Sequence, residues 1–161
     1  MSKMKLWLLG LACVLILGFL TACVPPTPPE CRAFLNSPRE ERHAEFRKYD
    51  IEKQLDVYLC TTKAELPDVG LADEMANRGE VVIGPIIAKL KSVSSETDKY
   101  EMIHLLEIMS ERGYLQGKKD VVAQISDVVG SIKTDSIKQR SAESLKKIQL
   151  NSGIKPFTYV P

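Results

Sequence analysis

The sequence predicts an all-α protein built as a short stack of antiparallel helical hairpins. From Ser37 onward, apolar residues recur every three or four positions, as they do on one face of an α-helix. No stretch alternates strictly between apolar and polar residues over the length of a strand. Two helix-ending segments also match each other, which indicates that one helical unit is repeated.

The composition suits a single folded domain. The chain has 161 residues, of which 44% are hydrophobic and 27% are charged, and this argues against wholesale disorder. Its 22 basic and 21 acidic residues leave a formal net charge of +1. Because such a chain has no strong field to attract phosphate, the composition argues against a nucleic-acid-binding protein.

Residues 1–22 are predicted to be a signal peptide. Lys3 and Lys5 precede an uncharged, mostly apolar run from Leu6 to Ala22. A basic start, a short apolar stretch and small residues before Cys23 are typical of a secretory signal. The run is marginal for a helix that spans a membrane, so an uncleaved membrane helix is the less favoured alternative.

The end of this segment resembles the lipobox of bacterial lipoprotein precursors: Leu20, Thr21, Ala22 and Cys23. The resemblance implies that cleavage makes Cys23 the first residue and that its thiol carries lipid, including palmitate. Several acyl chains would then anchor the protein durably in the cell envelope, since each buried methylene contributes about 0.8 kcal/mol. Val24 stands where an aspartate would signal inner-membrane retention, which implies the outer membrane, facing the periplasm, in a Gram-negative source.

Residues 23–36 are predicted to combine the acylated cysteine with a proline-rich tether. Residues 24–29 read V-P-P-T-P-P, and prolines hold the backbone near polyproline II. At about 3.1 Å per residue, these six residues would hold the folded body roughly 19 Å from the acylated cysteine.

Cys31 and Cys60 are the two cysteines that remain as thiols, because Cys13 leaves with the signal and Cys23 takes lipid. Two cysteines in an exported protein predict one disulfide, and the alternative is two unrelated free thiols. They are too few for a structural zinc site.

The helix that follows decides between these alternatives. A continuous helix from Pro38 to Cys60 would be roughly 33 Å long, whereas the seven residues from Cys31 to Pro38 span at most about 25 Å. A disulfide therefore requires the chain to turn near Tyr49. If the helix is continuous, the bond should be absent.

The helical-repeat domain is predicted over residues 37–150. Ser37 as the cap, with Pro38 at the first position and Glu40 in the first turn, predicts the start of its first helix. Asp50 is expected to cap a second helix, whose apolar face carries Ile51, Leu55, Tyr58 and Leu59.

Three further helices are separated by turn and stop residues at Pro67, Gly70, Gly79 and Gly113. Pro85 lies early enough in the second of them to bend it without breaking it. Ser95 or Thr97 is expected to cap the third. We expect their buried residues to be Leu71, Ala72, Met75 and Ala76, then Val81, Val82, Ile86, Ile87 and Leu90, then Ile103, Leu106 and Met109.

Two local matches suggest a repeat. Residues 75–79 (M-A-N-R-G) match residues 109–113 (M-S-E-R-G), and the helix after each match also corresponds. A helix pair that recurs at about 40 residues is typical of HEAT and armadillo proteins. The sequence resembles HEAT-like helical-repeat proteins, and residues 49–58 and 71–81 resemble a group of uncharacterised exported bacterial proteins. The resemblance implies a fold but no activity.

The last helix, residues 136–150, has the mixed polar pattern of a terminal capping helix, and Gly153 is expected to end it. Residues 151–161 are predicted to be an extended tail that carries Phe157 and Tyr159. This tail either straps over the last helices, which we favour, or serves as a free peptide for a partner.

No arrangement of residues predicts an enzyme, a metal site, a cofactor or a small-molecule substrate. His43 is expected on an exposed helix face and His104 at a partly buried position. Glu107 and Glu111, one helical turn apart, are expected to form one solvated face on which Arg112 offsets their repulsion.

We therefore expect a lipid-anchored envelope protein that acts by protein–protein contact, as a scaffold or adaptor. The alternative is an inhibitor or immunity protein against an envelope-active toxin or hydrolase. The candidate partner-binding residues are Lys53, Gln54, Asp56, Lys118 and Lys119. Arg78 and Arg112, at matching positions, are expected to complement the carbonyls at the ends of their own helices.

Overall fold

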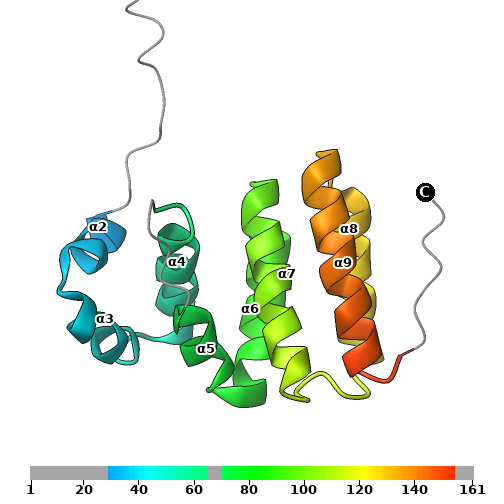
Figure 1. Cartoon of the computed structure of the whole chain (residues 1–161), viewed down its shortest axis with the longest axis horizontal. Coiled ribbons are helices and arrows are strands. Elements are labelled where there is room, and N and C mark those ends of the chain that lie inside the picture. The colour runs from blue at the N-terminus through cyan, green and yellow to red at the C-terminus, as the bar shows by residue number, and fades with distance from the viewer. Residues whose placement is uncertain (1–28, 65–69, 155–161) are drawn as a thin grey trace, which may run out of the picture.

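The computed structural model describes residues 29–64 and 70–154, and every regular element in these ranges is a helix (Figure 1). This confirms the all-α prediction for the described part of the chain. The elements are α2 (Pro29–Asn36), α3 (Arg39–Phe46), α4 (Ile51–Thr61), α5 (Gly70–Ala76), the 3-10 helix η1 (Gly79–Val82), α6 (Ile83–Ser92), α7 (Glu96–Glu111), α8 (Lys119–Ser131) and α9 (Asp135–Asn151).

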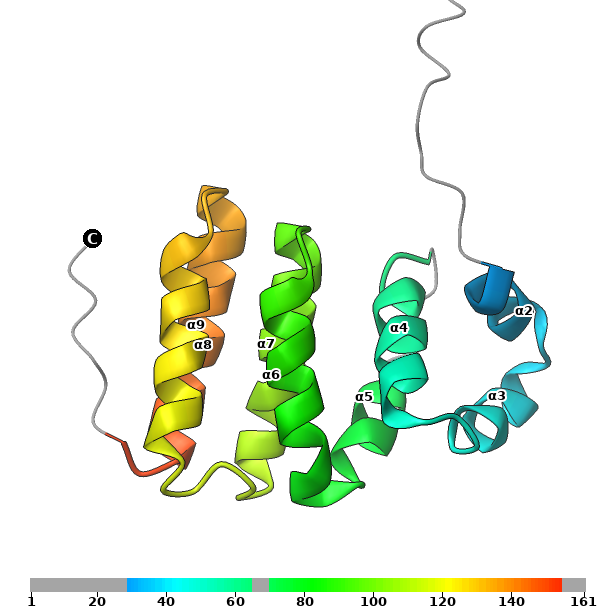
Figure 2. The same cartoon turned by 180° about the vertical axis from the view of Figure 1, so that it is seen from behind.

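The helices form two layers. In one layer α2, α4, α6 and α8 pack side by side, and in the other α3, α5, α7 and α9 do so. Contacts between the layers join helices that are consecutive along the chain, above all α6 with α7 and α8 with α9. Figures 1 and 2 show the two layers from opposite sides, with α7 and α9 nearer the viewer in Figure 1 and α6 and α8 nearer in Figure 2.

The hydrophobic core lies between the layers and is centred on α7. This helix packs against α5, α6 and α9, so it is covered on three sides. Five of its apolar side chains have no exposed surface: Met102, Ile103, Leu105, Leu106 and Met109. Burial of apolar surface on several sides of one helix is the main stabilising contribution that we identify in this stack.

The helix is interrupted between α3 and α4, and the chain turns there. A disulfide between Cys31 and Cys60 requires such a turn. The side chain of Asp50 caps α4 by accepting a hydrogen bond from the Lys53 amide at 2.8 Å. Cys31 and Cys60 form a disulfide, with their Cα atoms 6.1 Å apart. The prediction of one disulfide with a turn near Tyr49 is therefore confirmed.

The helical body begins earlier than residue 37. Residues 29–36, which we assigned to the tether, form α2, because Cys31 and Phe34 lie one turn apart and are both buried. The predicted cap at Ser37 is wrong for the same reason. Its hydroxyl donates to the Ala33 carbonyl at 3.1 Å and so closes α2, while Pro38 occupies the cap position of α3.

Val81 is also placed differently from the prediction. We expected it on the buried side of a regular helix, but residues 79–82 form the 3-10 helix η1, and Val81 is 68% exposed. A 3-10 helix has three residues per turn rather than 3.6, which shifts the buried positions along the sequence. Val82, which was also expected to be buried, has no exposed surface, so that part of the prediction is confirmed.

The predicted helix stops are confirmed. Gly79, Gly113 and Gly153 have φ angles of 74°, 82° and 68°, in the left-handed region where glycine avoids a Cβ clash. Of the two candidate caps for α7, Ser95 is the one used, and it accepts from the Asp98 amide at 3.3 Å.

Several sequence predictions lie outside the described residues. They are the signal and lipobox, the tether up to residue 28, the turn at Pro67, and Phe157 and Tyr159 of the tail. The described part of the tail ends at Ile154. This residue follows the end of α9 and is buried.

Candidate functional site

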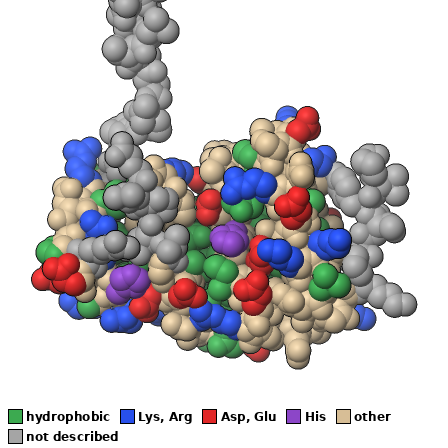
Figure 3. All heavy atoms as spheres, in the orientation of Figure 1, with side chains coloured by type: hydrophobic (Ala, Val, Ile, Leu, Met, Phe, Trp, Pro, Cys, Tyr) green, Lys and Arg blue, Asp and Glu red, His purple; other side chains and the backbone are tan. Residues whose placement is uncertain are grey.

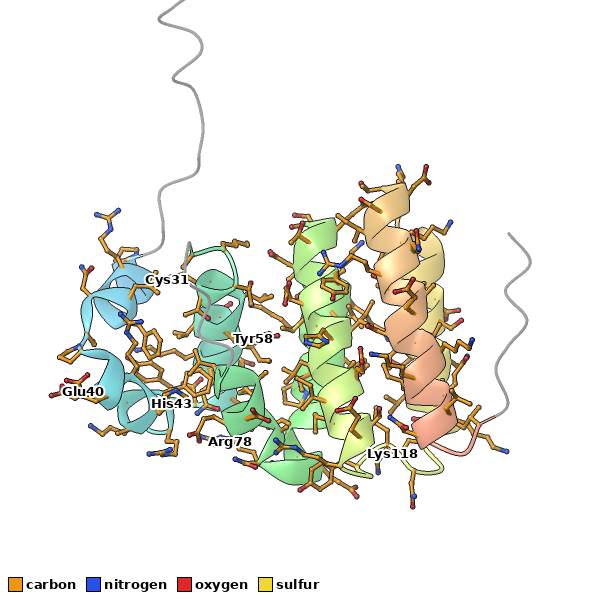
Figure 4. The ribbon with its side chains drawn as sticks, viewed as in Figure 1. Cys31, Glu40, His43, Tyr58, Arg78 and Lys118 are labelled. Atoms are coloured by element: carbon orange, nitrogen blue, oxygen red, sulfur yellow. A yellow bond between two sulfur atoms is a disulfide. The ribbon has the colours of Figure 1, made fainter. Side chains whose placement is uncertain are left out.

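The five predicted partner-binding residues do not form one site. Lys53, Gln54 and Asp56 lie on α4, whereas Lys118 and Lys119 lie where α8 begins, two hairpins further along the stack. Figure 4 shows Lys118 at the end of the molecule opposite Cys31.

Most of these side chains already have partners within the chain. Lys53 Nζ lies 4.1 Å from the centre of the Tyr49 ring, and Asp56 forms an ion pair with Lys89 of α6. Lys118 Nζ lies 2.8 Å from Glu80 Oε2.

Gln54 is not a partner-binding residue, because its side chain is buried. Only 1% of its surface is exposed, and its Nε2 donates to the Phe46 carbonyl at 2.6 Å, which joins α4 to the end of α3. A buried amide with a backbone partner is a structural group, and it cannot contact another protein.

The matched arginines bind the preceding hairpin rather than their own helix ends. Arg78 donates to the carbonyls of Arg47 and Tyr49, at 3.1 and 3.3 Å, just after α3. Arg112 donates to Asn77 Oδ1 at 2.6 Å and forms an ion pair with Asp73, both on or just after α5. The two arginines therefore play one role twice, each connecting a hairpin to the one before it.

His43 makes the same kind of connection. Its Nδ1 lies 3.3 Å from Glu74 Oε1, which also accepts from Arg47 at 2.6 Å. Its side chain is 33% exposed, so the prediction of a freely exposed helix face is wrong.

A row of polar residues runs along α7 that was not predicted from the sequence. Glu101, His104 and Glu107 are three residues apart, which places them on one face of the helix. Their spacing in the sequence was the signal that could have revealed this row. We had instead expected Glu107 to share a solvated face with Glu111.

Glu107 is buried, not solvated, with 4% of its surface exposed. Lys147 of α9 donates to its Oε1 at 2.6 Å, and His104 Nδ1 lies 3.5 Å from its Oε2. Desolvation alone would raise the pKa of this carboxyl. The hydrogen bonds from Lys147 and Ser144 outweigh it, so the pKa of Glu107 lies below its usual value.

Glu101 is the opposite case. Its Oε2 lies 3.5 Å from the hydroxyl of Tyr58, a buried residue of α4 that points toward α7 (Figure 4). Desolvation raises the pKa of Glu101, and the positive charge of Arg140 and the neighbouring His104 only partly offset it. Burial also raises the pKa of the Tyr58 hydroxyl. The surroundings of Glu101 therefore disfavour the ionised form of its carboxyl group.

His104, the middle residue of this row, also belongs to a stack of three side chains on the outer surface. The rings of Tyr100 and His104 lie 6.1 Å apart and are nearly parallel, at 6°. The guanidinium carbon of Arg140, from α9, lies 4.0 Å from the centre of the Tyr100 ring. We call Tyr100, His104 and Arg140 the aromatic–arginine stack.

The stack joins α7 to α9, the last two helices of the layer that also contains α3 and α5, and we call the outer face of this pair the α7–α9 layer. Figure 3 shows this face, on which hydrophobic, charged and histidine side chains lie next to one another. The side chain of His104 is 41% exposed and Arg140 is exposed as well, so both are accessible from outside. The structure thus offers a surface that is ordered by its own contacts and still open to a partner.

Substitutions of Glu101 and Glu107 are expected to change the free energy of unfolding in opposite directions. Glu107→Gln should lower the free energy of unfolding by about 1–2 kcal/mol at neutral pH, because charged hydrogen bonds are lost. That difference should vanish as the pH falls through the lowered pKa of Glu107 in the folded state. Glu101→Gln should stabilise the protein at neutral pH, where the wild-type carboxylate is ionised against its raised pKa.

Urea unfolding of both variants and the wild type, at neutral pH and near pH 4, measures these effects. The stabilising effect of Glu101→Gln should disappear at the lower pH, where the wild-type carboxyl is largely protonated. A destabilised Glu101→Gln variant at neutral pH would contradict the proposed environment of this residue.

The described residues contain no group of three His, Cys, Asp or Glu side chains placed to hold a metal ion. Nor does any helix among them have the length and apolar character needed to cross a bilayer. Comparisons with protein-family models, curated proteins and solved structures found no match to this chain.

Proposed function

We propose that this protein is a lipid-anchored scaffold or adaptor of the bacterial cell envelope that acts by protein–protein contact. The anchor is Cys23, and the evidence for it is the resemblance of residues 20–23 to a lipobox. Cys23 precedes the start of α2 by six residues, which keeps the helical body close to the membrane.

We further propose that the body is a short HEAT-like stack. The equivalent roles of Arg78 and Arg112 support this, as do the left-handed glycines that follow each of them. In helical-repeat proteins each unit buries its apolar face against its neighbours, and the row of units presents an extended binding surface. The two layers described above are consistent with this arrangement.

The observation that carries the proposed function is the aromatic–arginine stack. Tyrosine and arginine are enriched among the residues that contribute most to protein–protein binding. Here Tyr100 and Arg140 come from neighbouring helices and hold each other in place before any partner arrives. Such preorganisation reduces the conformational entropy that is lost on binding.

Site-specific photo-crosslinking in cells tests this surface. A benzophenone-bearing amino acid in place of His104 is expected to give a discrete crosslinked product with an envelope protein. The matched control is the same amino acid in place of Ala123, which is exposed on α8 in the opposite layer. We expect the Ala123 position to give no such product.

The same cells report on the anchor. The wild-type chain should fractionate with membranes, and Cys23→Ser should move it to the soluble fraction, since the acylated thiol is lost. Equal crosslinking from both positions, or none from either, would contradict a partner site on the α7–α9 layer. A membrane-bound Cys23→Ser chain would contradict the proposed anchor.

A further inference from the structure

The helices of the two layers begin and end along two opposite edges of the body. We call these edges its ends, and they differ in charge. One end consists of residues 31–32, 62–64, 91–99 and 131–138, where α4, α6 and α8 end and α7 and α9 begin. We call it the basic end. Its described side chains include six basic and three acidic ones: Arg32, Lys63, Lys91, Lys99, Lys133 and Lys138, against Glu96, Asp98 and Asp135.

Direct contacts join the segments of the basic end into one surface. Lys63 Nζ, just beyond α4, lies 2.8 Å from Asp98 in the first turn of α7. The carboxylate of Glu96 accepts from the amides of Lys133 and Thr134, at 2.7 and 3.0 Å. Two of the three acids are thus engaged within this surface, whereas Arg32, Lys91 and Lys133 have exposed side chains.

The opposite end carries slightly more acid than base. It consists of residues 47–52, 73–80, 111–120 and 151–154, and its charged side chains are Arg47, Lys48, Arg78, Arg112, Lys118 and Lys119, against Asp50, Glu52, Asp73, Glu74, Glu80, Glu111 and Asp120. Three of the cations are in ion pairs with Glu74, Asp73 and Glu80. The positive potential is therefore concentrated at the basic end.

The chain that leads back to Cys23 enters the body at the basic end. The disulfide holds Cys31, in the first turn of α2, beside Cys60, which is one residue before α4 ends. Figure 4 shows Cys31 at the upper end of the molecule and Lys118 at the lower end. The end nearest the proposed anchor is thus the end with excess positive charge.

We propose that the basic end is a docking surface for anionic phospholipid headgroups, so that the body stands on the bilayer with its α7–α9 layer facing sideways. This inference rests on the proposed anchor at Cys23. From Cys23 to Pro29 the chain advances six residues, which at polyproline II spacing would span roughly 19 Å, so the basic end stays close to the headgroups. Each lysine near an anionic surface increases binding about fivefold.

Vesicle binding by the mature chain with Cys23→Ser tests the surface without the contribution of the acyl chains. The probes are vesicles of phosphatidylcholine alone and vesicles in which about a third of the lipid is phosphatidylglycerol. We expect binding to the anionic vesicles only, and we expect high salt to abolish it because it shortens the Debye length.

Paired charge reversals locate the surface. Lys91→Glu with Lys133→Glu, at the basic end, is expected to lower the partition coefficient on anionic vesicles at least about 25-fold. The matched control is Lys48→Glu with Lys119→Glu, which changes the net charge equally at the opposite end, where both lysines are exposed. We expect this control to lower the coefficient less than about threefold, because these residues face away from the bilayer.

Absence of binding to anionic vesicles, or an equal loss from both pairs, would overturn the docking surface. Flotation of the lipid-modified wild-type chain keeps this result separate from the proposed anchor. That chain should float with neutral and anionic vesicles alike, since acyl chains insert into both. Failure to float with either would refute the anchor, whereas flotation without a preference of the Cys23→Ser chain for anionic lipid would refute only the docking surface.

Discussion

Removal of the disulfide by Cys31→Ser with Cys60→Ser is expected to lower the free energy of unfolding by about 3–4 kcal/mol. The bond closes a loop with a sequence separation of 29, and most of its effect comes from restricting the unfolded chain. The folded state also depends on it, because α2 packs chiefly against α4, the helix to which the bond joins it. Urea unfolding of the double variant and the oxidised wild type measures the difference.

Wild-type protein treated with a reductant is the control for this variant. It should unfold at the same urea concentration as the double serine variant, since both lack the same covalent constraint. The effect should be largest for α2, so the amides of residues 31–36 should exchange with solvent faster in both samples. A loss of less than about 1 kcal/mol would show that the bond adds little to the noncovalent packing of α2.

Leu106→Ala is expected to lower the free energy of unfolding by about 3–5 kcal/mol. Leu106 has no exposed surface and lies on α7, which packs against three other helices. Removal of its side chain leaves a cavity that none of these helices can close without disturbing its other contacts. Thermal and urea unfolding, monitored by circular dichroism, both measure the loss.

Leu150→Ala is the matched control. It is the same substitution on another helix, α9, but Leu150 is 60% exposed. We expect a change within about 0.5 kcal/mol, as is usual for a surface site. Similar losses for the two variants would contradict a core centred on α7.

The helices themselves could largely be predicted from local sequence. The caps at Asp50 and Ser95 and the stops at Gly79, Gly113 and Gly153 depend on the conformations that these few residues favour. Helical spacing of apolar residues then identified most of the core. Val81 was misplaced because a 3-10 helix and an α-helix have almost the same short-range pattern.

The candidate site was less accessible to sequence reasoning. Glu107 looks like half of a solvated pair until α9 brings Lys147 to within 2.6 Å of it. The matched arginines were recognised as equivalent, but their partners lie on the hairpin before them, 29 to 39 residues away in the chain. Local sequence holds no information about which carbonyl lies within reach of a side chain across such a distance.

From the sequence alone came the all-helical character of the described residues, most helix ends, and the lipobox on which the proposed anchor rests. The sequence also set the condition that a disulfide between Cys31 and Cys60 requires a turn near Tyr49, and the structure then showed that the condition is met. These follow from backbone preferences and hydrophobic period, which act over a few residues. Only the tertiary structure decided that Gln54 and Glu107 are buried, that Tyr100, His104 and Arg140 form one stack, and that positive charge gathers at one end of the body. The physical reason is that burial and electrostatic environment depend on which helices pack together, and packing joins residues that are distant along the chain.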